Sequence, residues 1–185
     1  LTSGPSIPVI SAGELVASEK LGNYDLEVIQ LFAAGEIFNA KLCEQNHIRL
    51  KTFRSGQTVY EDIFDGKQDY IPANLVEIPY IFGTRAIEID IAVISTSPPD
   101  KRGFMSLGVA VDVVDTVIKH AAVVIAEVNP NMPVTSGDSS IHVDQVQYVI
   151  MSNEPLLERE PRPYTPVHER IGWQVSNLIQ DVSTV

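Results

Sequence analysis

The chain has 185 residues, of which 24 are Asp or Glu and 13 are Lys or Arg, so its formal net charge is −11. The basic residues are scattered along the sequence. Nucleic acids and membrane surfaces are anionic and are bound by clustered Lys and Arg, so this pattern argues against both as partners. The single cysteine, Cys43, excludes an intrachain disulfide, and a chain of this length buries enough surface to fold as one domain without one.

The sequence contains no apolar run of membrane-spanning length and no basic-then-apolar pattern at its N-terminus, so we expect a cytoplasmic protein without a membrane partner. No histidine pair has the spacing of a zinc site, and neither a Walker A nor a G-x-G-x-x-G pattern occurs. We therefore expect no metal site, and the sequence lacks the phosphate-binding pattern of nucleotide-binding folds.

Strand-like and helix-like segments alternate along the chain. Apolar, β-branched runs predict strands over residues 26–32, 48–53, 70–73, 89–96, 123–128 and 146–151. Helical spacing predicts helices over residues 7–19, 58–64, 74–82 and 111–121. This alternation predicts an α/β fold with an open, mostly parallel sheet and helices on both faces, in three α/β/α layers.

Both ends of the sequence have the pattern of a domain that continues. Residues 1–6 resemble the junction between a strand and a glycine loop, so we expect a truncated first strand at the start of a domain over residues 1–152. Proline and charge make residues 153–165 a predicted connector. A last helix is expected from Pro166 to about Gln180, within a segment (166–185) that leads to an absent C-terminal catalytic domain.

Two loops are the strongest site candidates. One runs from Ser97 to Gly108 and the other from Asn129 to His142, and each follows a predicted buried strand. Ligands of open α/β sheets bind at the carboxyl ends of strands. In the first loop, Pro98 and Pro99 impose a rigid, extended exit from the strand, and Asp100 fits a turn better than a general base.

The second loop contains Gly137, Asp138, Ser139 and His142 within six residues. Glycine permits close approach of the backbone to a ligand, and Asp and Ser form local hydrogen bonds. Ligand contact and a purely structural Asp-Ser hydrogen-bond cluster both remain open. A Ser-His-Asp triad is not expected, because the nucleophile-elbow pattern is missing.

The ordered motifs resemble the N-terminal half of the acetyl-CoA hydrolase/transferase family, which includes 4-hydroxybutyrate CoA-transferase and succinate:acetate CoA-transferase. The resemblance rests on Ser97-Pro98-Pro99-Asp100 with Gly103 and Ser106-Leu107-Gly108, on Ile125 to Asn129, on Asn131-Met132-Pro133, and on Gly137-Asp138-Ser139 with Ile141-His142. Two positions depart from the family pattern: Lys101-Arg102 stands where an acidic-His pair is usual, and Ser136 stands where His is frequent.

The resemblance implies an acyl-CoA:carboxylate CoA-transferase or acetyl-CoA hydrolase in which a glutamate nucleophile lies in the C-terminal domain, outside this chain. No catalytic residue is therefore expected here, and the chain alone should be inactive. Its implied partners are acyl-CoA, a small carboxylate and its own C-terminal domain, with homo-oligomers at full length. Coenzyme A enters as a thioester substrate, and no further cofactor is implied. The implied cleft residues are Gly4, Pro5, Ser6, Ser97, Pro98, Pro99, Gly137, Asp138, Ser139 and His142.

The Gly4-Pro5-Ser6 loop corresponds by position to a family glycine loop near the reacting thioester, although a turn with a helix cap explains the same residues. A catalytically silent α/β module that binds acyl-CoA or a sugar phosphate and regulates a partner is the alternative function, because one fold serves many activities. The sequence leaves the acceptor acid, and transfer versus hydrolysis, undecided.

Overall fold

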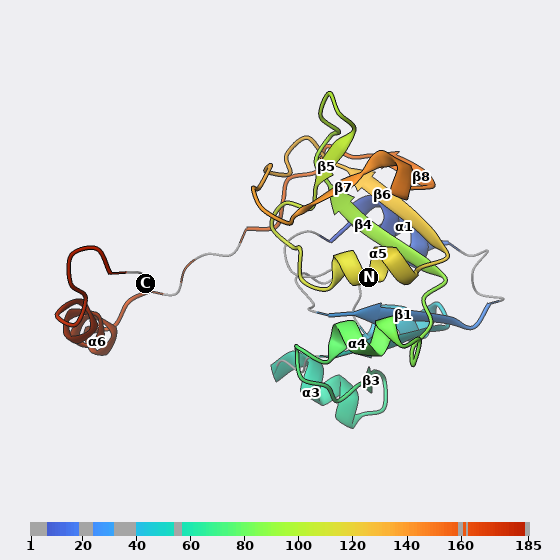
Figure 1. Cartoon of the computed structure of the whole chain (residues 1–185). Helices are drawn as coiled ribbons and strands as arrows, with labels where there is room; N and C mark the ends of the chain where they lie inside the picture. Colours follow the sequence, from blue (N-terminus) through green and yellow to red (C-terminus); the bar gives the residue numbers. More distant parts are fainter. Residues whose placement is uncertain are drawn as a thin grey trace.

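The computed structural model of the chain describes residues 7–18, 24–31, 40–53, 57–158, 161 and 163–183 (Figure 1). The helices are α1 (Val9–Ala17), α2 (Ala40–Gln45), α3 (Gln57–Phe64), α4 (Ile78–Gly83), α5 (Val114–His120), the 3-10 helix η3 (Val143–Gln145) and α6 (Pro166–Ser176). The strands are β1 (Leu26–Gln30), β2 (Ile48–Thr52), β3 (Asp69–Tyr70), β4 (Ile91–Thr96), β5 (Phe104–Ser106), β6 (Val123–Val128), β7 (Ser140–His142) and β8 (Tyr148–Met151).

Parallel pairing dominates the sheets, as the sequence predicts. One three-stranded sheet has the order β1-β2-β3 and a second has the order β4-β6-β8, and both are parallel throughout. The register of the second sheet places Ile91 opposite Val123 and Thr96 opposite Val128. The carboxyl ends of β4 and β6 therefore lie side by side, and the two candidate loops leave the sheet at the same edge.

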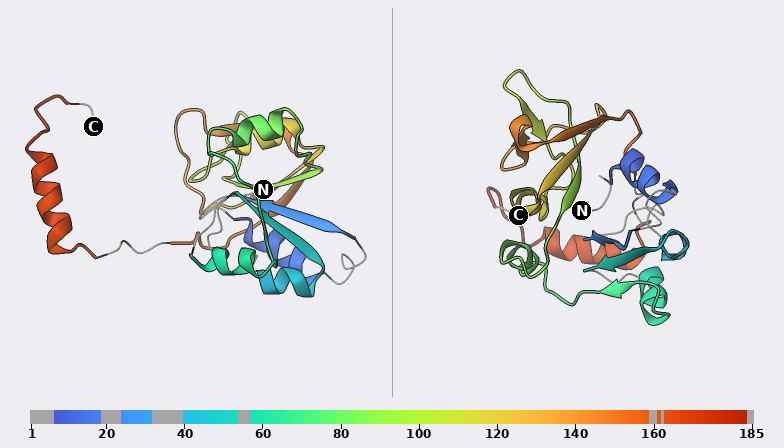
Figure 2. Two further views of the ribbon diagram at one scale, coloured as in Figure 1. Left: turned by 90° about the horizontal axis from the view of Figure 1, so that it is seen from below. Right: turned by 90° about the vertical axis from the view of Figure 1, so that its right-hand side faces the viewer.

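Helices cover both faces of these sheets (Figure 2). On one face, α4 and α5 bury Phe82 and Val117 in the main core, against Ala92 and Ile94 of β4 and Val124 of β6. On the other face, Val16 of α1 and Cys43 of α2 pack with Ile48 and Leu50 of β2. The predicted three-layer arrangement is thus formed by apolar helix faces that meet apolar strands.

The structure departs from the sequence predictions in the two candidate loops. Each loop contains a strand of three residues, β5 and β7, and these strands pair antiparallel with Met105 opposite Ile141. Three residues are too few to show a periodic pattern, which is why both were expected to be loop. The last predicted strand also begins later, at Tyr148, because η3 precedes it.

The predicted C-terminal helix is present as α6, although it ends at Ser176, before the expected Gln180. Thr165 accepts a hydrogen bond from the His168 backbone and caps its start, and Pro166 occupies its first turn. Figures 1 and 2 show α6 apart from the sheets, and all its residues are exposed. Among the described residues, no helix is long and apolar enough to cross a membrane.

Candidate functional site

The first candidate loop is clamped to the sheet immediately after β4. Ser97 is buried, and its Oγ accepts a hydrogen bond from the Ser106 amide at 2.9 Å and donates to the Pro98 carbonyl at 3.1 Å. The Ser97 amide also donates to the Ser106 carbonyl at 2.9 Å. Residues 97–106 therefore fold back on themselves as a hairpin-shaped loop that stands on the carboxyl end of β4.

Asp100 closes the turn of this hairpin. Its Oδ1 accepts hydrogen bonds from the amides of Arg102 and Phe104, each at 2.8 Å. The hydrogen bond from the Phe104 amide is the main reason that the pKa of Asp100 lies below its usual range, and the Arg102 amide adds to it. Asp100 is thus an ionised turn residue, and its geometry does not suit a general base.

A network of hydroxyl groups joins the two candidate loops. Ser106 Oγ accepts hydrogen bonds from the amides of Gly108 and Thr135, both at 3.1 Å, and lies 3.2 Å from Thr135 Oγ1. Thr135 Oγ1 is also within 3.1 Å of the Gly108 carbonyl and 3.0 Å of Ser139 Oγ. Ser139 Oγ donates to the Thr135 carbonyl at 3.1 Å. Residues almost 30 positions apart are fixed together by this network.

An open cavity of about 350 Å³ lies beside the network. Its lining residues are Ser97, Pro98, Asp100, Arg102, Phe104, Met105, Ser106, Val134, Thr135 and Ser140. Both apolar side chains and hydroxyl groups line it, and Arg102, whose guanidinium lies 5.3 Å from the centre of the Phe104 ring, is its cationic member. The cavity sits where strand carboxyl ends meet, the usual position of an α/β ligand site.

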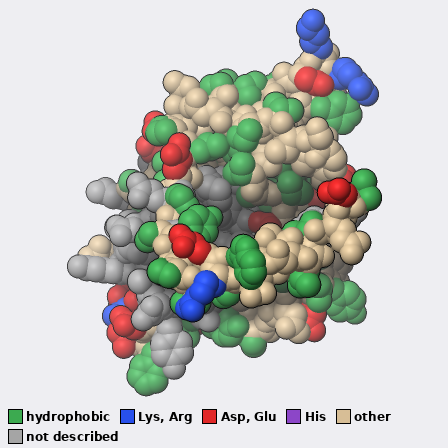
Figure 3. Space-filling model, turned by 90° about the vertical axis from the view of Figure 1, so that its left-hand side faces the viewer, with side chains coloured by type: hydrophobic (Ala, Val, Ile, Leu, Met, Phe, Trp, Pro, Cys, Tyr) green, Lys and Arg blue, Asp and Glu red, His purple; other side chains and the backbone are tan. Residues whose placement is uncertain are grey.

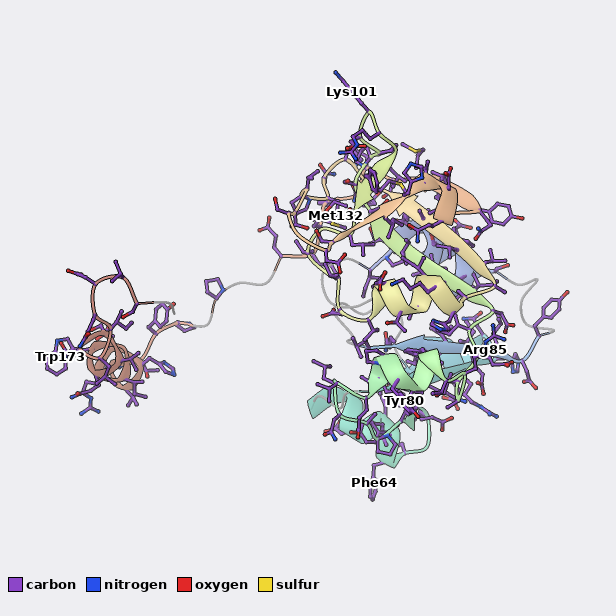
Figure 4. All side chains as sticks on the ribbon, viewed as in Figure 1. Phe64, Tyr80, Arg85, Lys101, Met132 and Trp173 are labelled. Carbon is purple, nitrogen blue, oxygen red and sulfur yellow. The ribbon has the colours of Figure 1, made fainter. Side chains whose placement is uncertain are left out.

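Gly108 and Met132 form the second contact between the loops. Gly108 has a φ of +62°, and a Cβ added to it would lie 2.2 Å from Met132 Sδ. Met132 is buried, and Figure 4 shows it at the foot of the loops, whereas Lys101 points outward at the hairpin tip. Only glycine permits this backbone conformation and this close approach together.

His142 holds the hairpin from the side of β7. Its Nε2 lies 3.0 Å from the Arg102 carbonyl, its Nδ1 accepts a hydrogen bond from the Asp144 amide at 3.3 Å, and its ring meets the Phe104 ring edge-on at 5.1 Å. A tautomer that carries the proton on Nε2 satisfies both hydrogen bonds. The Ser139 hydroxyl is hydrogen-bonded to Thr135 and not to His142, so Ser139 and His142 do not form a hydrolytic pair.

Asparagine side chains anchor the exit of β6 to the connector that follows β8. Asn129 Nδ2 donates to the Glu154 carbonyl at 2.7 Å, and Asn129 Oδ1 accepts from the Asn131 amide at 2.9 Å. Asn131 Nδ2 donates to the Asn153 carbonyl at 3.1 Å. The loop after β6 and the start of the predicted connector therefore form one rigid corner.

Glu127 is a buried carboxylate near the end of β6. It accepts hydrogen bonds from the Ser11 amide at 2.9 Å, the Ser11 hydroxyl at 2.7 Å and the Ile10 amide at 3.3 Å. These groups belong to the first turn of α1, where amides lack intrahelical acceptors and the helix dipole favours an anion. Glu127 thus holds the N-terminus of α1 against the carboxyl edge of the second sheet.

The structure distributes the sequence-predicted cleft residues unevenly. Ser97 and Pro98 line the cavity, and Ser139 supports it through Thr135. Pro99, Gly137 and Asp138 are exposed and do not line it, and His142 lies behind the hairpin. Gly4, Pro5 and Ser6 lie outside the described residues.

Sequence reasoning missed the roles of Ser106, Thr135, Arg102 and Glu127. Ser106 and Glu127 occur within the motifs that carry the family resemblance, which is the signal that could have selected them. Thr135 and Arg102 have no such signal. The role of Thr135 depends on its contact with Ser106, which is distant in the sequence, and the role of Arg102 depends on its position over the Phe104 ring.

Other reactive groups do not gather at the cavity. Burial raises the pKa of the Cys43 thiol to about 11, so it is protonated at neutral pH, and it packs beneath β2. Within the part of the chain that the structure describes, no group of three or more His, Cys, Asp or Glu side chains could hold a metal ion. On the face drawn in Figure 3, two basic side chains lie close together at the upper right, and the other basic side chains lie singly among apolar and acidic ones.

Curated relatives match most of this chain. Over 86% of the length of this chain, it is 36% identical to 4-hydroxybutyrate coenzyme A transferase of Clostridium kluyveri. Over 98% of the length of this chain, it is 34% identical to succinyl-CoA:acetate/propanoyl-CoA:succinate CoA transferase of Fasciola hepatica. The matched region covers 37% of each of these relatives, so the chain spans little more than a third of their length.

Solved structures show the same fold. RipA from Yersinia pestis superposes with a TM-score of 0.84 at 25% identity, over 97% of this chain and 44% of RipA. A 4-hydroxybutyrate CoA-transferase from Porphyromonas gingivalis superposes with a TM-score of 0.63 at 25% identity, over 94% of this chain and 46% of that protein. The model of the acetyl-CoA hydrolase/transferase N-terminal domain matches residues 8–158. The chain therefore belongs to the acetyl-CoA hydrolase/transferase family and contains its N-terminal domain.

Proposed function

We propose that this chain forms one wall of the acyl-CoA cleft in an acyl-CoA:carboxylate CoA-transferase or acetyl-CoA hydrolase. The observation that carries the proposal is the cavity between the loops after β4 and β6, whose lining includes Ser97, Pro98 and Ser106 from the motifs that carry the family resemblance. Two relatives that match most of this chain are named as CoA transferases, which supports acyl-CoA and a small carboxylate as the substrates.

The proposed reaction needs a carboxylate nucleophile, which the family resemblance assigns to a glutamate of a second domain, outside this chain. A glutamate of a second domain attacks the thioester carbonyl, the C–S bond breaks, and CoA leaves as the thiolate. The thiolate then attacks the glutamyl carbonyl of the resulting anhydride, which releases the first acid as its carboxylate and leaves a glutamyl-CoA thioester. A second carboxylate repeats these steps in reverse and departs as the new acyl-CoA.

The described residues contribute position and polarity to this reaction. The network of Ser106, Thr135 and Ser139 keeps the two loops at a fixed separation, so the cavity is formed before substrate arrives. Arg102 supplies a cation in a protein with a net charge of −11, and it suits the anionic groups of either substrate. Water access to the acyl-enzyme decides between transfer and hydrolysis.

A catalytically silent acyl-CoA-binding module is the second candidate. One observation favours it: Asp100 is the carboxylate among the cavity residues, and its Oδ1 is occupied by the turn amides. This function needs the cavity but no nucleophile.

A CoA-exchange assay separates the two functions. Residues 1–185 and the full-length protein are each incubated with unlabelled acyl-CoA and an isotopically labelled carboxylate, and label in acyl-CoA is measured. The proposal predicts exchange by the full-length protein and none by residues 1–185. Failure of the well-folded full-length protein to exchange CoA with any of acetate, propionate, butyrate, 4-hydroxybutyrate or succinate, together with failure to hydrolyse acetyl-CoA, would favour the silent module.

A further inference from the structure

Arg102 is the one basic residue in the lining of the cavity, and among the described residues its guanidinium forms no ion pair. Its neighbour Lys101 points outward at the hairpin tip in Figure 4 and is not part of that lining. Two adjacent basic residues therefore have different surroundings. Of the two, only Arg102 is placed to meet a ligand in the cavity.

The backbone of Arg102 is held at both of its polar groups. Its amide donates a hydrogen bond to Asp100 Oδ1 at 2.8 Å, and its carbonyl oxygen lies 3.0 Å from His142 Nε2. Gly103 follows with a φ of +84°, and a Cβ added to it would lie 2.6 Å from the same His142 nitrogen. Only glycine permits this approach of the imidazole to the hairpin. The position from which the Arg102 side chain leaves the backbone is thus fixed before a ligand binds.

The guanidinium of Arg102 is oriented by an aromatic ring. It lies 5.3 Å from the centre of the Phe104 ring, and the other contact of that ring is the edge-on His142 imidazole at 5.1 Å. Contact with an aromatic ring does not use the N–H groups of a guanidinium as hydrogen-bond donors. Two of these donors can therefore bind the two oxygens of one carboxylate.

The rest of the cavity wall suits a short carbon chain. The hydroxyl groups of Ser97, Ser106 and Thr135 already form hydrogen bonds within the protein. The apolar side chains of the lining are those of Pro98, Phe104, Met105 and Val134. Arg102 is therefore the lining group with a charge to offer a ligand.

The charge balance of the cavity favours a carboxylate over a phosphate. Asp100 lines the same cavity as an ionised carboxylate, with its Oδ1 held by two turn amides, so it offsets the charge of Arg102. A terminal phosphate carries about −1.5 to −2 charges near neutral pH and is poorly matched by one cation beside a carboxylate. A carboxylate carries a single charge and pairs one-to-one with a guanidinium.

We propose that Arg102 is a specificity-determining residue that binds the distal carboxylate of a dicarboxylic substrate, as the free acid or as its CoA thioester. The short chain between the two carboxyl groups lies against the apolar part of the wall, and the reacting carboxyl group is left at the open side of the cavity. This inference rests on the proposed function and names the class of acid that the cleft takes.

Succinate and butyrate test the proposal, because they have the same number of carbons and differ by the distal carboxylate. CoA exchange from acetyl-CoA to each acid is measured as kcat/KM with the full-length protein and with its Arg102→Gln and Lys101→Gln variants. The unsubstituted protein should favour succinate. Arg102→Gln should lower the ratio of the succinate value to the butyrate value about tenfold, since a hydrogen-bonded charge pair is lost. Lys101→Gln should leave the ratio unchanged, and the same ratio in all three proteins overturns the proposal.

Calorimetric binding of the two acids to the same three proteins gives a readout that needs no transfer. A preference for succinate that disappears in Arg102→Gln and persists in Lys101→Gln supports the proposal even where exchange fails, whereas failed exchange counts against the proposed function alone. Equal affinities of the unsubstituted protein for the two acids overturn the proposal. So does an Arg102→Gln variant that weakens binding of CoA more than binding of 3′-dephospho-CoA and leaves the preference for succinate intact, because the guanidinium then binds a phosphate.

Discussion

Gly108 belongs to the first candidate loop, and its backbone packs directly against Met132 of the second. Its φ of +62° and the 2.2 Å separation between a built Cβ and Met132 Sδ mean that alanine suffers both backbone strain and a steric clash. We expect Gly108→Ala to lower the free energy of unfolding by roughly 2–4 kcal/mol, as the sum of the two effects.

Denaturant unfolding of Gly108→Ala, compared with Gly66→Ala, measures the packing part of this cost. Gly66 has a φ of +73°, and a Cβ there would meet nothing within 4 Å, so its variant pays only the backbone cost. We expect the Gly108 variant to be the less stable of the two. Equal stabilities would show that Met132 yields without cost and that the loops are not tightly packed.

Asp100 gives the hairpin a pH dependence with a defined sign. The amides of Phe104 and Arg102 stabilise the ionised carboxylate, so the pKa of Asp100 is lower in the folded protein than the value near 3.9 of an unfolded chain. Its contribution to stability is fully present above the unfolded pKa and is lost as the pH falls through the folded pKa.

Unfolding measured from pH 6 to pH 2.5 should therefore show a stability loss at the acid end that is smaller in Asp100→Asn than in the unsubstituted protein. The asparagine oxygen still accepts both amide hydrogen bonds, so the variant should fold. An NMR titration should place the Asp100 midpoint below about 3.9. A midpoint above this value would contradict the turn geometry.

At the scale of elements, the contact between α1 and β6 rests on the Glu127 carboxylate. Glu127→Gln keeps the size of the side chain but removes the negative charge that three donors of α1 share. We expect a loss of roughly 1–3 kcal/mol, since hydrogen bonds to a buried charge are stronger than neutral ones. Hydrogen exchange should accelerate in Val9–Ala17 more than in Val114–His120. Uniform acceleration of both helices would indicate general destabilisation and no specific anchoring of α1.

Elements with long apolar patterns were predicted best, whereas the six-residue helix α2 was missed. Residues 123–128 are apolar except for Glu127 and form β6 with the predicted bounds, because a parallel strand that is covered on both faces needs apolar side chains on both. β5 and β7 were not predicted. Each has three residues, and their partnership depends on contacts between Met105 and Ile141, which no local pattern reports.

The same contrast holds for the candidate site. The two loops were predicted because each follows a buried strand, and the parallel pairing of β4 with β6 brings their starts together. The cavity itself depends on the hydroxyl contact between Ser106 and Thr135, which are 29 residues apart. Such long-range side-chain pairs are visible only in three dimensions, so the exposed Asp138 was selected and Thr135 was not.

For the whole molecule, we propose that this chain binds and positions the substrates and that a second domain carries out the covalent chemistry. The family membership and the cavity support the first assignment. Trp173 of α6 lies apart from the sheets in Figure 4, and both Trp173 and Ile171 of this helix are exposed.

The most direct measurement is to trap and locate the covalent intermediate. Full-length protein is treated with acyl-CoA and then with borohydride or hydroxylamine, digested, and mapped by mass spectrometry. We predict one modified glutamate, in a peptide outside residues 1–185, and the same modification in Asp138→Ala at saturating acyl-CoA. A modified residue within residues 1–185, or its loss in a folded Asp138→Ala protein, would contradict the division of roles proposed for this chain.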